Sequence, residues 1–130
     1  MPRLTLTQFN DWLDAYGEAW IEGNPTQIVG LFDADARYHV TPFDEPLVGH
    51  EAIRRYWEAG PRDAHQYVRF SHDVIAVAGE IGVARWHATF LHVAAGHRIE
   101  LDGVFVAEFD ADGCCTVLRE WWHKREGTGD

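Results

Sequence analysis

The fold is decided by residues 99–124, IELDGVFVAEFDADGCCTVLREWWHK. The two halves of this stretch alternate in the manner of β-strands. Asp112-Gly113 between them is a turn signal, because glycine adopts positive φ without strain. Apolar side chains nevertheless fall on both faces of both strands, whereas a sheet with one solvated face shows clean apolar/polar alternation. We therefore expect a hairpin that is covered on both faces.

The composition is that of a globular protein. The chain has 130 residues, a formal net charge of −10 and six tryptophans, and this length suffices for one domain with a hydrophobic core over residues 1–130. A nucleic-acid surface needs clustered Lys and Arg, so no nucleic-acid partner is expected. No apolar run approaches the ~18 residues of a membrane helix, and the N-terminus lacks a signal-peptide pattern. We expect a cytoplasmic protein without a membrane partner.

Cysteine and histidine spacing predicts neither a disulfide framework nor a metal site. Cys114 and Cys115 are adjacent, so they cannot join distant parts of the fold. His50-Glu51 begins like the zinc-binding helix motif, but position 54 is arginine and the motif fails. We expect no metal and no cofactor.

The first 61 residues indicate three helices and one strand. Thr5 and Gln8 have capping-box spacing and Gly23 is a stop signal, which predicts a helix over about 6–22. Asn24-Pro25 is a cap followed by proline at the first helical position, which predicts a short helix that stops near residue 33. The remaining elements are a strand over 36–41 and a third helix from Gly49 to Gly60-Pro61.

From residue 66 onward the chain alternates as strands do. The sequence predicts strands over 66–78 and 81–93, joined by a turn at Gly79-Glu80, followed by the two strands of the hairpin. Helices therefore come first and a four-strand antiparallel meander follows. Segregated elements of this kind favour an α+β fold, with the helices on one face of a bent sheet.

Several short stretches carry a family resemblance. They are Glu22-Gly23-Asn24 after a long helix, Leu31-Phe32-Asp33-Ala34-Asp35-Ala36, Leu47-Val48-Gly49-His50-Glu51-Ala52-Ile53, and Phe109-Asp110-Ala111-Asp112-Gly113. Residues 5–125 resemble the nuclear-transport-factor-2-like fold, also called the cystatin-like cone, and within it the SnoaL-like polyketide-cyclase group. The resemblance implies three N-terminal helices packed on a strongly curved, mixed or antiparallel sheet. It also implies an internal apolar pocket for a small ligand and a homodimer through the outer sheet face.

Comparison with two enzyme branches of this fold narrows the expected activity. Tyr16 falls on the tyrosine that the steroid-isomerase branch uses as oxyanion donor, but Val40 replaces its base and Phe105 its neutral aspartic acid. Without a base at that position, ketosteroid isomerisation is not expected. The epoxide-hydrolase branch is not matched either, because Arg85 is followed by Trp86-His87 rather than by an acid two residues on.

Alignment with the steroid-isomerase branch implies which strand residues face into the cone, and Glu120 is among them. Glu120 there is expected to be desolvated, which raises the pKa of a carboxyl group and suits a general acid or base. His72 is a candidate proton-transfer partner, and Tyr16 or Tyr38 a candidate donor to a substrate carbonyl. The predicted catalytic set is thus Glu120, His72 and Tyr16.

Each of these residues also has a purely structural interpretation. Glu120 can pair with an arginine such as Arg69 or Arg119, His72 can be a satisfied core histidine, and the Tyr16 hydroxyl can cap a neighbour. Aromatic residues of the inner face either fill the cone or line a pocket for a flat apolar ligand. The predicted substrate-binding residues are Tyr38, Trp57, Phe70, Trp86, Phe90, Phe105 and Trp122.

Two classes of function follow from the sequence. The first is a cofactor-free isomerase, cyclase or dehydratase that uses acid/base chemistry on an apolar substrate. The second is a non-catalytic ligand-binding or dimerisation domain. An open cavity that reaches Glu120 would favour the first class, whereas a cone filled by Trp57, Trp86 and Trp122 would remove its substrate site.

Overall fold

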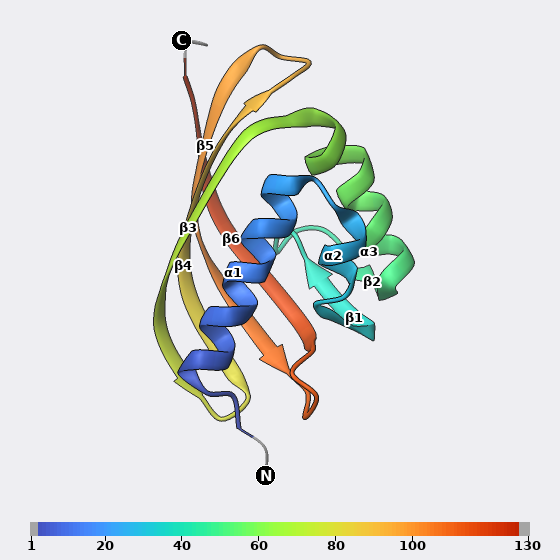
Figure 1. The fold of residues 1–130 in the computed structure, drawn as a ribbon, viewed down its shortest axis with the longest axis vertical. Coiled ribbons are helices and arrows are strands. Elements are labelled where there is room, and N and C mark those ends of the chain that lie inside the picture. The colour runs from blue at the N-terminus through green and yellow to red at the C-terminus, as the bar shows by residue number, and fades with distance from the viewer. Residues whose placement is uncertain (1–2, 128–130) are drawn as a thin grey trace.

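A computed structural model describes residues 3–127, and residues 1, 2 and 128–130 lie outside the described part (Figure 1). The helical elements are α1 (Leu6–Glu22), α2 (Pro25–Val29), α3 (Gly49–Trp57) and a π-helical turn, η1 (Glu58–Arg62). The strands are β1 (Phe32–His39), β2 (Leu47–Val48), β3 (His65–Ala78), β4 (Ile81–His92), β5 (His97–Phe109) and β6 (Cys115–Glu126).

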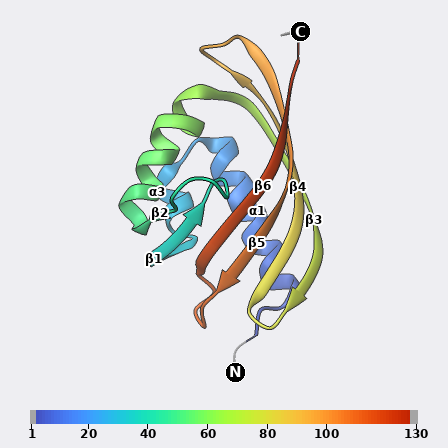
Figure 2. The same cartoon turned by 180° about the vertical axis from the view of Figure 1, so that it is seen from behind.

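The strands form one curved, mixed sheet in the order β2-β1-β6-β5-β4-β3. Neighbouring strands are antiparallel except β1 and β6, which run parallel. All helices lie on the concave face, where α1 packs on β3 and α3 packs on β1 (Figures 1 and 2). The expected α+β cone is therefore confirmed. No helix within residues 3–127 is long and apolar enough to cross a membrane.

Local signals begin the first two helices, and end α1, where the sequence predicts. The Thr5 side chain accepts from the Gln8 backbone N–H at 3.1 Å, and the Gln8 side chain accepts from the Thr5 N–H at 2.9 Å. Gly23 ends α1 in the left-handed conformation with φ 63°. The Asn24 side chain then accepts from two backbone N–H groups of α2. These caps give acceptors to backbone N–H groups that have no partner within their own helix.

Four features differ from the sequence-based expectation. α2 ends at Val29, about four residues before the predicted stop, because Gly30 caps it and Phe32 already pairs with Cys115 of β6. β1 begins at Phe32, four residues before the predicted start, because its pairing with Cys115 of β6 extends the strand through a polar segment. Leu47-Val48 forms a two-residue strand on β1, which the alternation is too short to reveal. The helix expected to close at Gly60-Pro61 continues as η1 through both residues, as a widened turn.

The inner and outer faces of β4, β5 and β6 follow the predicted alternation. Inward side chains are buried, including Trp86, Phe105 and Glu120. Gly103 of β5 packs closely against β6 and Trp86. A Cβ there would press on the Trp121 carbonyl oxygen and would approach Trp122 Cβ to 2.9 Å and Trp86 Nε1 to 3.0 Å.

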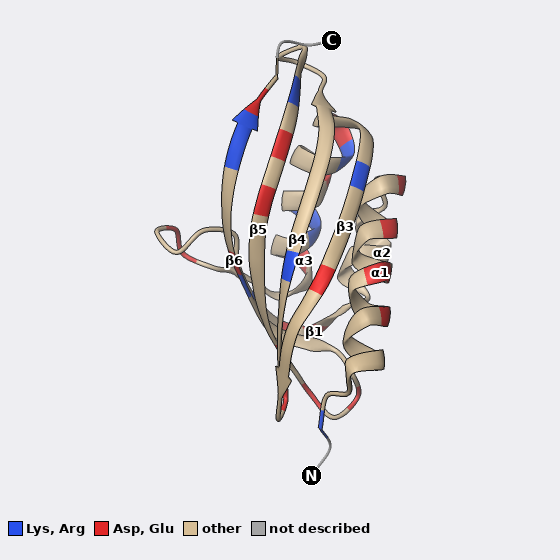
Figure 3. Ribbon diagram, turned by 90° about the vertical axis from the view of Figure 1, so that its left-hand side faces the viewer, with Lys and Arg blue, Asp and Glu red and all other residues tan. Residues whose placement is uncertain are grey.

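The outer face carries paired charges across β3–β6 (Figure 3). Arg85 of β4 binds Asp102 of β5, and Arg119 of β6 binds Glu108 of β5 at 2.9 Å. The exposed side of α1 is acidic, as the same view shows (Figure 3). Charge is therefore concentrated outside the cone, and the interior is left to aromatic side chains.

Candidate functional site

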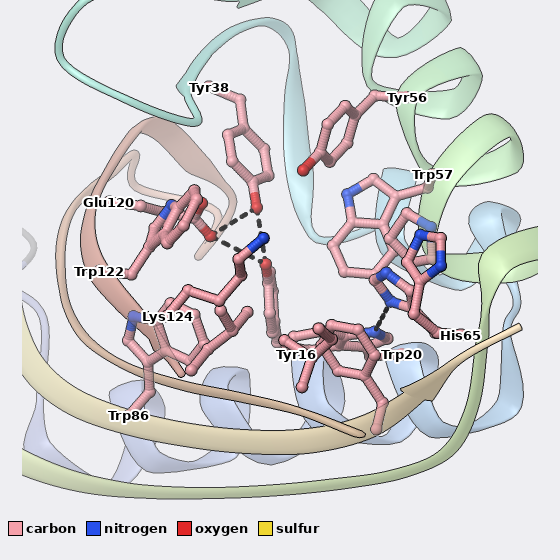
Figure 4. Close-up of a pocket in the computed structure, with 15 residues that line it drawn as sticks. Tyr16, Trp20, Tyr38, Tyr56, Trp57, His65, Trp86, Glu120, Trp122 and Lys124 are labelled. Carbon is pink, nitrogen blue, oxygen red and sulfur yellow. Dashed lines mark hydrogen bonds between the residues drawn. The ribbon is translucent and has the colours of Figure 1, made fainter. Parts of the chain in front are cut away.

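A pocket of about 220 Å³ opens inside the cone, between α1, α3 and the concave face of β4–β6 (Figure 4). Trp57, Trp86 and Trp122 line this space and leave it open. The complete lining is Tyr16, Trp20, Tyr38, Tyr56, Trp57, Pro61, His65, Trp86, Phe90, His92, Ile99, Leu101, Glu120, Trp122 and Lys124.

A carboxyl group and two phenols meet at the inner wall of this pocket (Figure 4). Glu120 of β6 is 6% exposed, and its Oε1 accepts from the Tyr38 hydroxyl at 2.8 Å and from the Tyr16 hydroxyl at 3.4 Å. The two hydroxyl oxygens lie 2.6 Å apart. Three separate elements, α1, β1 and β6, thus contribute one polar side chain each.

The number of available protons fixes the direction of these hydrogen bonds. A phenol has one O–H donor. The Tyr38 proton goes to Glu120 Oε1, so Tyr16 supplies the proton of the 2.6 Å bond and shares it with Oε1 at 3.4 Å. Both tyrosine protons are therefore used within the cluster. In this arrangement the tyrosines hold the carboxyl group, and neither has a free proton for a substrate carbonyl.

The second carboxyl oxygen of Glu120 behaves differently from the first. Within residues 3–127, Oε2 has no hydrogen-bond partner, yet it is not among the fully covered unpartnered atoms. It therefore faces the pocket that Glu120 lines. One oxygen is fixed by the protein, and the other is free to meet a bound molecule.

Burial raises the pKa of Glu120 to about 8, although the hydrogen bonds from Tyr38 and Tyr16 oppose part of that rise. Burial and the nearby Glu120 charge also hold the pKa values of both tyrosines well above their ordinary value. At neutral pH the carboxyl group is mostly protonated, with its proton on Oε2. The site then presents a neutral acid rather than an anion.

Neighbouring residues fix the position of Glu120. It alternates with Leu118 and Trp122 on the inner side of β6, and the Trp122 indole donates to the Val40 carbonyl at 3.1 Å. Across the sheet Glu120 pairs with Phe105, whose ring packs 5.1 Å from that of Tyr16. The apolar surroundings that raise the pKa of Glu120 are thus built from β6, β5 and α1.

The structure brings Glu120 to Tyr16 and Tyr38 but does not bring His72 to them. The His72 Nε2 lies 2.8 Å from Asp14 Oδ1, at the side of the sheet covered by α1, and His72 does not line the pocket. The expected pairing of His72 with Glu120 is therefore corrected. His72 faces inward as expected, but β4 and β5 separate its strand from β6.

The ion-pair interpretation of Glu120 is also overturned. Arg119 points to the outer face and binds Glu108, and among residues 3–127 no Lys or Arg forms an ion pair with Glu120. Of the seven predicted substrate-binding residues, Phe70 and Phe105 lie behind the pocket wall, where they stack on Trp86. The five that line the pocket are Tyr38, Trp57, Trp86, Phe90 and Trp122.

His65 and Tyr56 are pocket residues that the sequence did not single out. The His65 ring stacks on Phe90 with centroids 3.8 Å apart, and its Nδ1 accepts from the Trp20 indole at 3.1 Å. Burial, with a smaller contribution from His92, lowers the pKa of His65 to about 4. The pairing of His65 with His92 across the β3–β4 hairpin was the available signal, because it puts two histidines at one end of the sheet.

Comparison with known proteins identifies the family. The profile of the SnoaL-like domain matches residues 13–117. The chain belongs to the SnoaL-like domain family. No curated protein sequence matches this SnoaL-like domain significantly. Within residues 3–127, no three His, Cys, Asp or Glu side chains are grouped so as to hold a metal ion.

Solved structures share the fold of this SnoaL-like domain at low sequence identity. SalBIII, an epoxide hydrolase/cyclase-like enzyme with a role in pyran ring formation in the polyether salinomycin, is 18% identical with a TM-score of 0.77, over 90% of this chain and 92% of its own. A computationally designed 17-OHP binder is 16% identical with a TM-score of 0.79, over 92% and 96%. The Δ5-3-ketosteroid isomerase from Mycobacterium sp. is 13% identical with a TM-score of 0.79, over 92% and 98%.

Proposed function

We propose that this SnoaL-like domain binds a small apolar molecule in its cone and transfers a proton to it from Glu120, without a cofactor. One observation carries the proposal: Glu120 is buried with Oε1 held by two phenols, and its Oε2 faces a pocket of about 220 Å³. The Oε2–H group donates its proton to a substrate oxygen. The resulting carboxylate takes a proton from a carbon or hydroxyl group of the same molecule. In isomerisation, ring closure and loss of water alike, Glu120 gives one proton and takes one back, so it ends the reaction in its starting state.

The energetics of the cluster suit this role. A pKa of about 8 lies near neutral pH, where a general acid combines the right protonation state with a sufficient driving force. The tyrosine hydrogen bonds strengthen when Glu120 becomes an anion, because bonds to a charged acceptor are about twice as strong as neutral ones. The cluster therefore stabilises the state that forms as the proton leaves.

The similar structures help to choose among reactions. SalBIII, with its role in pyran ring formation, supports ring closure as one reaction for this chain. Ketosteroid isomerisation is not proposed, because Val40 and Phe105 stand where that chemistry needs acids. We place ring closure or dehydration of an oxygenated apolar substrate first.

The test compares the wild type with Glu120→Gln on three neutral substrate sets: epoxy alcohols, β-hydroxy ketones and β,γ-unsaturated ketones. Product formation is followed by chromatography and mass spectrometry. Removal of a general acid/base costs about 10²–10⁴-fold in rate, so we expect at least a hundredfold loss. Glu108→Gln, a carboxylate of the outer face, is the matched control. Unchanged turnover in Glu120→Gln would rule out the proposed role.

A ligand-binding domain without catalysis is the second candidate. His72 binds Asp14 instead of approaching Glu120, so the proton-transfer partner expected beside Glu120 is not at that position. The computationally designed 17-OHP binder is a protein of this fold that binds a ligand. Ligand recovered unchanged after saturation of the wild type, at every pH from 6 to 9, would favour this candidate.

We further propose a homodimer through the outer sheet face. Trp121 of β6 is 45% exposed there, and it pairs with Val104 on the neighbouring strand. Val106 and Val117 lie on the same face, between the ion pairs described above. An exposed tryptophan beside valines and ringed by charges has the pattern of an isologous interface.

A further inference from the structure

We propose that His65 is a specificity-determining residue, and that the pocket selects an uncharged, flat molecule of about two fused rings with an acceptor oxygen at each end. The proposal rests on the ligand site of the proposed function and names the class of molecule that fits it. It is carried by the hydrogen-bonding groups that the pocket leaves free, and by their charge.

The hydrogen bond from Trp20 determines which ring nitrogen of His65 carries the proton. An indole N–H is a donor only, so the Trp20 indole, 3.1 Å from His65 Nδ1, requires a bare nitrogen there. The proton of the neutral ring is therefore on Nε2. Stacking on Phe90 at 3.8 Å holds the ring plane in place.

The Nε2–H group of His65 is a donor without a partner among residues 3–127, and it is not a fully covered atom. His65 lines the pocket, so a bound molecule can reach this N–H. The indole N–H groups of Trp57 and Trp86 also lack partners, but the protein covers both. His65 is thus a reachable donor where the two indoles are not.

Glu120 and His65 face the pocket from opposite sides in Figure 4. Tyr16, which contacts Glu120, and Trp20, which contacts His65, lie four residues or about 6 Å apart along α1. The two donors therefore face the pocket at different levels along this helix. A rigid molecule of two fused rings with one oxygen at each end can therefore meet both donors.

The free donors around the pocket are neutral, and this sets the charge of the ligand. Glu120 Oε2–H and His65 Nε2–H carry no charge in the states described, and Tyr56 adds a phenol from α3. The ammonium group of Lys124 also lines the pocket, but it binds Glu126 at 3.2 Å. A carboxylate on the ligand would lose its hydration, and the half-exposed Lys124, already paired with Glu126, would offset only part of that loss.

The experiment measures binding of a matched series by isothermal titration calorimetry at pH 7. The probes are tetralin, 1-tetralone, 6-methoxy-1-tetralone and the 6-carboxylate of 1-tetralone. Each acceptor oxygen that meets a donor is expected to raise affinity about three- to tenfold. The carboxylate is expected to bind at least tenfold more weakly than the methoxy compound.

Variants test whether His65 causes the second gain in affinity, which is that of 6-methoxy-1-tetralone over 1-tetralone. His65→Phe keeps a flat ring on Phe90 and removes the N–H, so both tetralones should bind it equally. His65→Gln should restore the increment, because an amide offers Trp20 an acceptor and the ligand a donor. The role of His65 is contradicted if the gain from the methoxy oxygen survives in His65→Phe. It is also contradicted if that gain disappears in Tyr56→Phe instead. Preference of the wild type for the carboxylate overturns the ligand class.

The series also separates this inference from the proposed function. Glu120→Gln retains an N–H donor at the carboxyl position but cannot transfer a proton. It should bind the tetralones nearly as the wild type does. If the acid/base role of Glu120 is wrong, the affinities for the tetralones stay as expected. If the two-donor site is wrong, the gains in affinity from the acceptor oxygens disappear, but Glu120→Gln still lowers turnover.

Discussion

At the residue scale, the acidity of Glu120 results from two opposing influences. Burial favours the neutral carboxyl group, and hydrogen bonds from Tyr38 and Tyr16 favour the carboxylate. Burial prevails, but the phenols bring the pKa back toward the range in which proton transfer is useful. The aromatic hydroxyl groups therefore adjust the acid rather than contact a substrate.

Tyr38→Phe should raise the pKa of Glu120. The substitution removes the 2.8 Å hydrogen bond to Oε1, and a hydrogen bond to a charged group contributes about 1.5–3 kcal/mol. At 1.36 kcal/mol per pKa unit, the rise is about one to two units. The carboxyl carbon shift of Glu120, followed by NMR against pH, gives the value. Tyr56→Phe is the control, and a lowered pKa in Tyr38→Phe would contradict the explanation.

The stability of the fold should fall between pH 6.5 and pH 8. The pKa of Glu120 rises from 4.5 to about 8 on folding, so the folded state binds more protons than the unfolded state in that range and loses stability as pH rises through it. His65 has the opposite effect, but only between about 4 and 6.5, where its folded and unfolded pKa values lie. Above pH 6.5 the Glu120 effect is no longer opposed by His65.

The expected loss from pH 6.5 to pH 8 is about 2 kcal/mol of unfolding free energy, at 1.36 kcal/mol per pKa unit. Urea denaturation at both pH values measures it. Glu120→Gln should remove this slope and be more stable than the wild type at pH 8. Glu18→Gln, an exposed position on α1, should retain the slope. An identical slope in the wild type and Glu120→Gln would contradict the linkage.

At the element scale, the sequence predicts what short-range chemistry determines. The Thr5–Gln8 capping box, the Gly23 stop and the alternation of β4–β6 all lie within a few residues of the features they specify, and the structure confirms them. The two-residue β2 and the early start of β1 depend on pairing with distant strands. No local pattern encodes such pairing.

In the candidate site, too, nearby residues determine some features and distant contacts determine others. Inward alternation predicts that Glu120 faces the cone, and its pocket position agrees. The choice between His72 and His65 depends instead on how α1 crosses the sheet, since Asp14 takes one histidine and Trp20 contacts the other. Helix-to-sheet packing brings residues together that are about 50 positions apart, which alternation within a strand cannot foresee.

Gly103→Ala should weaken the β5–β6 pairing. A methyl group there would approach Trp122 Cβ to 2.9 Å and would press on the backbone of Trp121. Overpacking of this kind costs about 1–3 kcal/mol. Urea denaturation measures the loss. Gly60→Ala is the matched control, because nothing lies within 4 Å of its added methyl group. Equal losses in both variants would show that packing around Gly103 is looser than described.

At the scale of the whole molecule, the proposed dimer makes a prediction about mass. Sedimentation at micromolar concentration should give a dimer for the wild type and a monomer for Trp121→Glu, because a carboxylate replaces the exposed indole at the centre of the face. Ile21→Glu, a substitution of an exposed apolar residue on α1, should remain dimeric. A monomeric wild type, or dissociation of Ile21→Glu alone, would contradict the proposed interface.

The parallel pairing of β1 with β6 has a consequence for how the protein is made. Tyr16 and Tyr38 lie 104 and 82 positions before Glu120 in the chain. A nascent chain that has emerged from the ribosome only through β5 holds both phenols and most of the aromatic wall, but it has no carboxyl group for them to bind. Contacts so distant in sequence form late, because loop closure must come first. The acid of the pocket is thus contributed by β6, which follows the other five strands of this sheet in the chain, and the site forms only after β6 has joined the sheet.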